Sequence, residues 1–95
     1  MKNTWKFEDQ KNTAVFATVE IICEGKPVLY VSHDEDGDWQ FLGSEGASYA
    51  QAMLVSLSSV VAGDESIEEL YDLPVGWIAQ RENVKENWSR KKKPE

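Results

Sequence analysis

The chain has 95 residues, of which 41% are hydrophobic and 11% aromatic, so we expect one folded domain with one modest core. The single cysteine, Cys23, excludes a disulfide framework and a multi-cysteine metal site. No apolar run approaches the roughly 18 residues of a membrane span, and residues 1–6 lack the apolar stretch of a secretory signal. These features predict a cytoplasmic protein that does not act at a membrane.

Charge is distributed unevenly along the chain. Residues 1–84 contain 5 Lys/Arg and 15 Asp/Glu, a net charge of −10, whereas residues 85–95 have a net charge of +3. An acidic surface repels phosphate backbones, so the sequence argues against nucleic acid as a partner and favours a basic protein. The pattern divides the chain into a polar N-terminal segment (1–13), a single α+β domain (14–84) and a basic flexible tail (85–95).

The first predicted elements form a β-hairpin. Residues 14–23 alternate with a period of two and are rich in β-branched side chains, which is typical of a strand. Residues 24–27 interrupt this pattern and residues 28–33 resume it, so a turn is expected at Gly25 and Lys26. Cys23 and His33 would then lie on the order of 17 Å apart, too far for a catalytic thiol and imidazole pair. We expect Cys23 in the core and His33 at a strand end near solvent.

The remaining elements follow an acidic turn at residues 34–38. A third strand is predicted over residues 39–42, a loop over 43–48, and a strand followed by a helical turn between 53 and 61. Asp64 is a predicted N-cap for a short helix with Ile67, Leu70 and Tyr71 on one face, and residues 75–81 form the last strand. The fold class is α+β, with an antiparallel sheet of four to five strands and one or two short helices on one face.

The acidic turn has the spacing of a calcium loop but lacks the required glycine. Asp34, Asp36, Asp38 and Glu45 match loop positions 1, 3, 5 and 12, whereas position 6 is Trp39. We therefore reject an EF-hand, and a looser cation site built from two of these carboxylates stays open. The sequence contains no phosphate-binding glycine loop, catalytic triad order or metal-ligand spacing, so it predicts no cofactor and no enzymatic activity.

The four tryptophans divide into two groups. Trp39 and Trp77 lie within predicted strands and are expected to anchor the core. Trp5 and Trp88 lie in polar terminal segments, where an exposed indole would be a candidate contact residue. Gly76 follows Pro74 at the junction with the last strand, so we predict either a positive φ or a close backbone approach there.

Two stretches of the sequence are similar to a known family. One runs from residues 28–33 through the acidic turn into residues 39–42, and the other from residues 55–61 through Asp64 to residues 70–76 and Arg81. Over residues 14–82 this order resembles a family of small bacterial domains of unknown function, grouped with the immunity proteins of polymorphic toxin systems. The long acidic insert of that family is replaced here by residues 43–48. The resemblance implies a non-enzymatic protein that binds and blocks a toxin, and supplies no catalytic residues.

The leading hypothesis is a protein-interaction module whose acidic face meets a basic protein, for which a toxin is the candidate. The candidate partner-binding residues are the acidic turn and the two terminal tryptophans: Asp34, Glu35, Asp36, Asp38, Trp5 and Trp88. The alternative is a small ligand-binding or hydrolytic domain with a pocket between sheet and helix. The sequence leaves the oligomeric state open.

Overall fold

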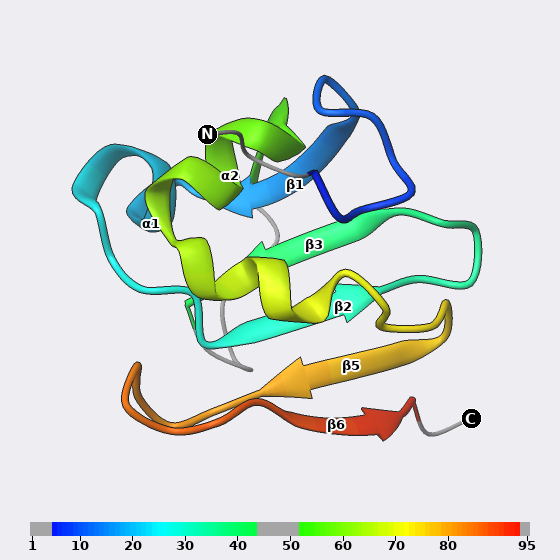
Figure 1. The fold of residues 1–95 in the computed structure, drawn as a ribbon. Coiled ribbons are helices and arrows are strands. Elements are labelled where there is room, and N and C mark those ends of the chain that lie inside the picture. The colour runs from blue at the N-terminus through cyan, green and yellow to red at the C-terminus, as the bar shows by residue number, and fades with distance from the viewer. Residues whose placement is uncertain (1–4, 44–51, 94–95) are drawn as a thin grey trace.

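The fold is built from one sheet and short helices (Figure 1). The computed structural model describes residues 5–43 and 52–93. In chain order its elements are β1 (Ala14–Thr18), α1 (Val19–Glu24), β2 (Tyr30–His33), β3 (Trp39–Leu42), β4 (Ala52–Ser56), α2 (Leu57–Gly63), the 3-10 helix η2 (Glu65–Leu70), β5 (Trp77–Gln80) and β6 (Ser89–Lys92).

The sheet is mixed rather than antiparallel. Its six strands lie in the order β4-β1-β3-β2-β5-β6. Strands β1 and β3 run parallel, and the other neighbouring pairs are antiparallel. The α+β class is therefore confirmed. The prediction of four or five antiparallel strands is wrong. The chain leaves the sheet after β1 through α1, so β1 does not pair with β2 and lies between β3 and β4.

The predicted first hairpin is a strand followed by a helix. Strand β1 ends at Thr18, where its pairing with β4 ends opposite Ala52. Residues 19–24 then form α1, and Gly25 ends that helix at φ +71 with its N–H donated to the Glu20 carbonyl. A glycine in this left-handed conformation is the usual helix C-cap, and it has the same sequence signature as a hairpin turn. Cys23 is consequently an exposed helix residue, and its predicted core position is wrong.

The later elements agree closely with the sequence prediction. Strands β2 and β3 form a hairpin around the acidic turn, with Tyr30 opposite Leu42 and His33 opposite Trp39. Strand β4 leads directly into α2, and the Asp64 side chain accepts the Ser66 N–H as the N-cap of η2. In each case the residues that determine the turn or cap are adjacent in the sequence.

The core lies between the sheet and the two helices α2 and η2, which cover one face (Figure 1). The side chains of Trp39 and Phe41 from β3 are almost fully buried in it, and Trp77 packs partly buried against it. A 3-10 helix repeats every three residues, so Ile67 and Leu70 point inward. Tyr71 is off this face and 45% exposed, contrary to its predicted place beside them.

Both flanking segments take part in the fold. Phe7, within the predicted polar N-terminal segment, is buried in the core and contacts Trp39 edge to face. Residues 89–92, predicted to belong to a flexible tail, form β6. The radius of gyration is 12.3 Å, the value expected of a compact domain of this length. No helix among the described residues is both long enough and apolar enough to cross a membrane.

Candidate functional site

The acidic turn after β2 is closed by its own backbone. The Asp34 N–H donates to the Asp38 carbonyl at 2.8 Å, and the Gly37 N–H donates to the Asp34 carbonyl at 2.9 Å. Gly37 has φ +94, a conformation that favours glycine. The Asp36 carboxylate accepts the Asp38 N–H at 3.3 Å. These contacts fix the positions from which the acidic side chains project.

Asp34 is the member of the turn that is used internally. Its carboxylate accepts hydrogen bonds from Ser32 Oγ at 2.8 Å and Gln40 Nε2 at 2.5 Å, and it pairs with the Lys93 ammonium. Burial raises the pKa of Asp34, but the Lys93 ammonium and the two other hydrogen bonds outweigh it and hold the pKa below its usual range. Asp34 therefore anchors the turn to β2, β3 and the end of the chain.

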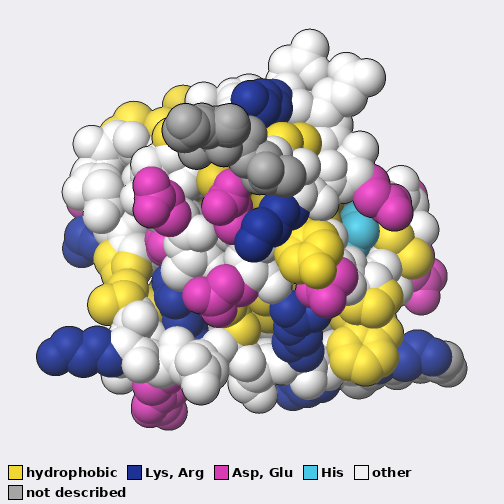
Figure 2. Space-filling view, viewed as in Figure 1, with side chains coloured by type: hydrophobic (Ala, Val, Ile, Leu, Met, Phe, Trp, Pro, Cys, Tyr) yellow, Lys and Arg dark blue, Asp and Glu magenta, His cyan; other side chains and the backbone are white. Residues whose placement is uncertain are grey.

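The other carboxylates of the turn point into solvent, and two hydrophobic residues of the segment before β5 are also exposed, one of them, Tyr71, with the Lys6 ammonium 5.9 Å from its ring centroid. Glu35, Asp36 and Asp38 are exposed, and so are Tyr71 and Val75 in the segment between η2 and β5. We call these five residues the acidic end. Figure 2 shows acidic and hydrophobic side chains on both sides of the single histidine, which lies at the end of β2.

The segment before β5 is fixed against the acidic turn by Gly76. This glycine has φ +82, and its N–H donates to the His33 carbonyl at 2.6 Å. A Cβ added to Gly76 would lie 3.5 Å from Glu35 Cγ, which is ordinary contact. The positive φ that the sequence predicted is thus confirmed. It brings Val75 next to the acidic turn.

The His33 ring is held by contacts within the fold. Its Nδ1 lies 2.7 Å from the Leu73 carbonyl, to which it donates, and its ring stacks on Trp39 with centroids 3.8 Å apart. Cys23 is in α1, which lies beyond the start of β2, whereas His33 ends that strand (Figure 1). The described residues therefore do not bring the thiol and the imidazole together.

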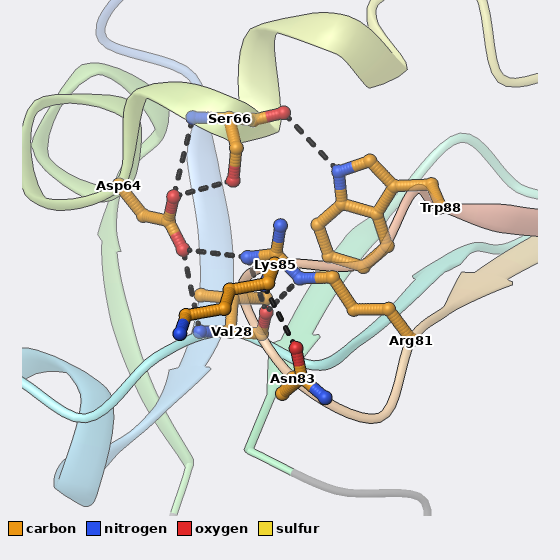
Figure 3. A network of polar contacts seen from close by, with 7 residues as sticks. All are labelled: Val28, Asp64, Ser66, Arg81, Asn83, Lys85 and Trp88. Atoms are coloured by element: carbon orange, nitrogen blue, oxygen red, sulfur yellow. Dashed lines mark hydrogen bonds and ion pairs between the residues drawn. The ribbon is translucent and has the colours of Figure 1, made fainter.

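The opposite end of β2 contains a buried polar network (Figure 3). Arg81 donates through Nε and Nη2 to the Val28 carbonyl, at 3.2 and 2.9 Å, and pairs with Asp64 at 3.1 Å. The same carboxylate accepts the Val28 N–H and both donors of Ser66. The indole of Trp88 lies over the guanidinium, 4.0 Å from ring centroid to Cζ, and donates to the Ser66 carbonyl. This network joins β5, η2 and the segment before β2.

The predicted contact tryptophans both make contacts within the chain. Trp88 is partly buried on Arg81, as described above. Trp5 is also partly buried, donates to the Asp9 carbonyl at 2.7 Å and contacts the ring of Phe7. A role for either indole in partner binding stays a prediction.

No metal centre is found in the described part of the chain, which has hollows on its surface. It contains no group of three or more His, Cys, Asp or Glu side chains arranged to hold a metal ion. Glu45, the last position of the calcium-loop comparison, lies outside the described residues, as does most of the predicted loop 43–48. A hollow of about 670 Å³ lies beside Arg81 and is lined by strand ends and the segment after β5, including Tyr30, Glu82 and Glu86.

The sequence predicted the acidic turn, but it did not predict that Tyr71 is exposed or that Arg81 forms a network at the other end of β2. Tyr71 was predicted to share a helix face with Ile67 and Leu70. The three-residue spacing of Ile67, Leu70 and Leu73 is a signal that a 3-10 helix leaves Tyr71 off that face. The Arg81 network carries no local signal, because its partners are 17 and 53 residues away in the chain.

Comparison with protein-family models, with curated proteins and with solved structures finds no match to this chain. The resemblance to immunity proteins remains a prediction. Functional interpretation therefore depends on the geometry of the two ends.

Proposed function

We propose that the chain is a non-enzymatic protein-interaction domain that binds a basic protein through its acidic end. The observation that carries this proposal is that the carboxylates of the turn differ in their contacts. The Asp34 carboxylate is hydrogen-bonded within the chain, and these bonds fix the backbone of the turn. Glu35, Asp36 and Asp38 are exposed on that backbone. Carboxylates on a fixed support lose little conformational freedom when a cationic partner binds.

The neighbouring hydrophobic residues suit the same role. Tyr71 and Val75 are 45% and 52% exposed, and an aromatic side chain beside charged groups is typical of protein interfaces. Complementary charge accelerates association and excludes acidic competitors. The family resemblance implies a toxin and the negative charge favours a basic partner, so a basic toxin is the partner that we propose.

Charge removal at the acidic end tests this proposal. The assay is a pull-down from source-cell lysate at about 0.05 M salt. In it, the variant Glu35→Gln/Asp36→Asn/Asp38→Asn should bind at least tenfold less partner than the parent chain binds. The parent should lose that partner at about 0.5 M salt, because exposed charge pairs are screened. A matched control, Glu24→Gln/Glu65→Gln/Glu82→Gln, removes the same charge from exposed positions elsewhere and should retain the partner.

Two outcomes would contradict the proposal. Equal retention by the two triple variants would show that the acidic end has no special role. Equal retention at low and high salt would exclude an electrostatic interface. Both variants alter exposed side chains, so their unfolding free energies should stay within about 0.5 kcal/mol of the parent, which separates lost binding from lost folding.

The alternative is a ligand-binding or hydrolytic domain with a pocket between sheet and helix, and one hollow that it could use lies beside Arg81. Glu82 and Glu86 line it, but the Glu86 carboxylate accepts the Glu82 N–H, and the Arg81 guanidinium is engaged by Val28 and Asp64. This hollow is formed by strand ends and a connecting segment rather than by a sheet and a helix. The acidic end is the better supported site.

A further inference from the structure

Strand β6 lies at the edge of the sheet with every side chain exposed. It pairs antiparallel with β5, with Arg90 opposite Ala79 and Lys91 opposite Ile78. The Lys93 N–H extends this ladder by donating to the Gly76 carbonyl at 2.8 Å. The neighbouring strand differs, because Ile78 and Ala79 of β5 are buried. Burial of apolar side chains holds β5 in the sheet, and it does not hold β6.

The partly buried Trp88 precedes β6, and the side chains that hold residues 90–93 are cations on acidic groups. Arg90 pairs with Asp72 at 2.7 Å and donates to the Glu69 carbonyl at 2.6 Å, and Lys93 pairs with Asp34. The edge of β5 is thus flanked by two carboxylates, and it already carries a basic extended segment supplied by the chain itself. These two carboxylates adjoin the acidic end.

We expect such a strand to open more easily than the rest of the sheet. Exposed ion pairs contribute little to stability because water and salt screen them. Ordering the residues of β6 costs conformational entropy that no buried side chain of β6 offsets. Local openings of this kind expose backbone groups of the next strand, which can then pair with another extended chain.

We propose that the edge of β5 is a docking site for a basic extended segment of the protein partner, and that residues 89–93 occupy this site until the partner displaces them. The inference rests on the proposed function for the class of partner. Charge complementarity selects the occupant, because a segment must place cations near Asp72 and Asp34 to replace Arg90 and Lys93. Backbone pairing with β5 supplies the rest of the contact.

A peptide in trans tests the docking site on the full chain. The probe is the hexapeptide Trp-Ser-Arg-Lys-Lys-Lys, which copies residues 88–93. The host Arg90→Ser/Lys93→Ser weakens the chain's own strand and should bind the probe at least tenfold more tightly than the parent does. The matched host Lys91→Ser/Lys92→Ser loses the same charge but keeps both ion pairs, and should bind it like the parent.

A second peptide separates strand pairing from charge attraction. Because the Lys93 N–H faces β5 and donors alternate along an antiparallel strand, the N–H at position 91 should face β5 as well. Methylation of that backbone nitrogen keeps every charge of the peptide and should reduce its binding at least tenfold. Equal binding of the two peptides, or equal binding of the probe by the two hosts, would overturn the proposal.

Hydrogen exchange on the unmodified chain tests the proposal without any substitution that could disturb the fold. The amides of Lys91 and Lys93 should exchange at least tenfold faster than the amide of Ala79, and faster again in high salt. Exchange of all three at one common rate would mean that β6 leaves only when the domain unfolds, and the proposal would fail. If the peptide tests fail while the acidic-end variant still loses its partner, the proposed function stands and only this docking mode falls.

Discussion

The two ends of β2 carry the same kinds of charged residue in opposite surroundings. Beyond its start, the Arg81 and Asp64 side chains are 2% and 19% exposed, and several hydrogen bonds connect them to the backbone. Beyond its end, Lys93 and Asp34 are 37% and 21% exposed, and three further carboxylates of the turn point into solvent. The two aspartates are almost equally exposed, so burial of the cation, 2% against 37% exposed, distinguishes the two pairs.

This difference shows which charges are available for binding. A buried guanidinium is tolerated only where acceptors satisfy it, and the Val28 carbonyl and Asp64 do so at the Arg81 end. Those groups connect three segments of the fold, and the guanidinium, 2% exposed, is not accessible to a partner. At the acidic end, one internal anchor leaves the remaining carboxylates in water, where a partner can reach them.

The largest effect is expected from Arg81→Met. This change leaves the Asp64 carboxylate and the Val28 carbonyl without their cationic partner and removes the contact with the Trp88 ring. The unfolding free energy, measured by urea titration, should fall by about 3 kcal/mol. Lys93→Met at the other end should cost less than about 1 kcal/mol, because that pair is partly exposed. Similar losses for the two variants would remove the distinction between the ends.

A smaller effect is expected from Gly76→Val, which tests the backbone of the acidic end. The φ of +82 is strained for valine, whereas the space around its Cβ is adequate. We expect a loss of about 1 to 3 kcal/mol in thermal or urea unfolding. Gly63→Ala is the control, because Gly63 has no positive φ and no atom within 4 Å of the added Cβ. A Gly76→Val protein as stable as this control would refute the assigned strain.

Local sequence signals predicted the elements that depend on adjacent residues. The aspartates and Gly37 indicated the hairpin of β2 and β3, and Asp64 indicated the start of η2. The hairpin predicted at Gly25 is wrong because a helix cap and a hairpin turn both place glycine after a hydrophobic run. Only the pairing of β1 with β3 and β4, which is long-range, decides between them.

Long-range contacts also limited the prediction of the candidate site. The sequence placed all the aspartates of the turn in one candidate group, whereas the internal use of Asp34 depends on Lys93, 59 residues further along the chain. The basic composition of residues 89–92 is typical of a solvated tail, and these residues form a strand because β5 offers an unpaired edge. No local pattern contains that information.

The smallest effect in this comparison is the pH dependence contributed by Asp34. Its pKa is lowered in the folded state below the ordinary value of 3.8, so its ionised form stabilises the fold above about pH 4. That contribution is lost as the pH falls through the lowered pKa. Between about pH 6 and pH 3 the parent should therefore lose more stability than Asp34→Asn, by less than about 1 kcal/mol because the carboxylate is partly exposed.

Two controls identify the source of this difference. Lys93→Met removes the main partner of Asp34 and should reduce the loss of stability at acid pH. About 0.5 M salt should reduce this loss partially in the parent, because the exposed ammonium is screened. Urea midpoints at each pH measure the effect. A parent and an Asp34→Asn protein with parallel acid profiles would show that the carboxylate is not an internal anchor. Asp34 would then join Glu35, Asp36 and Asp38 as a charge available to a partner.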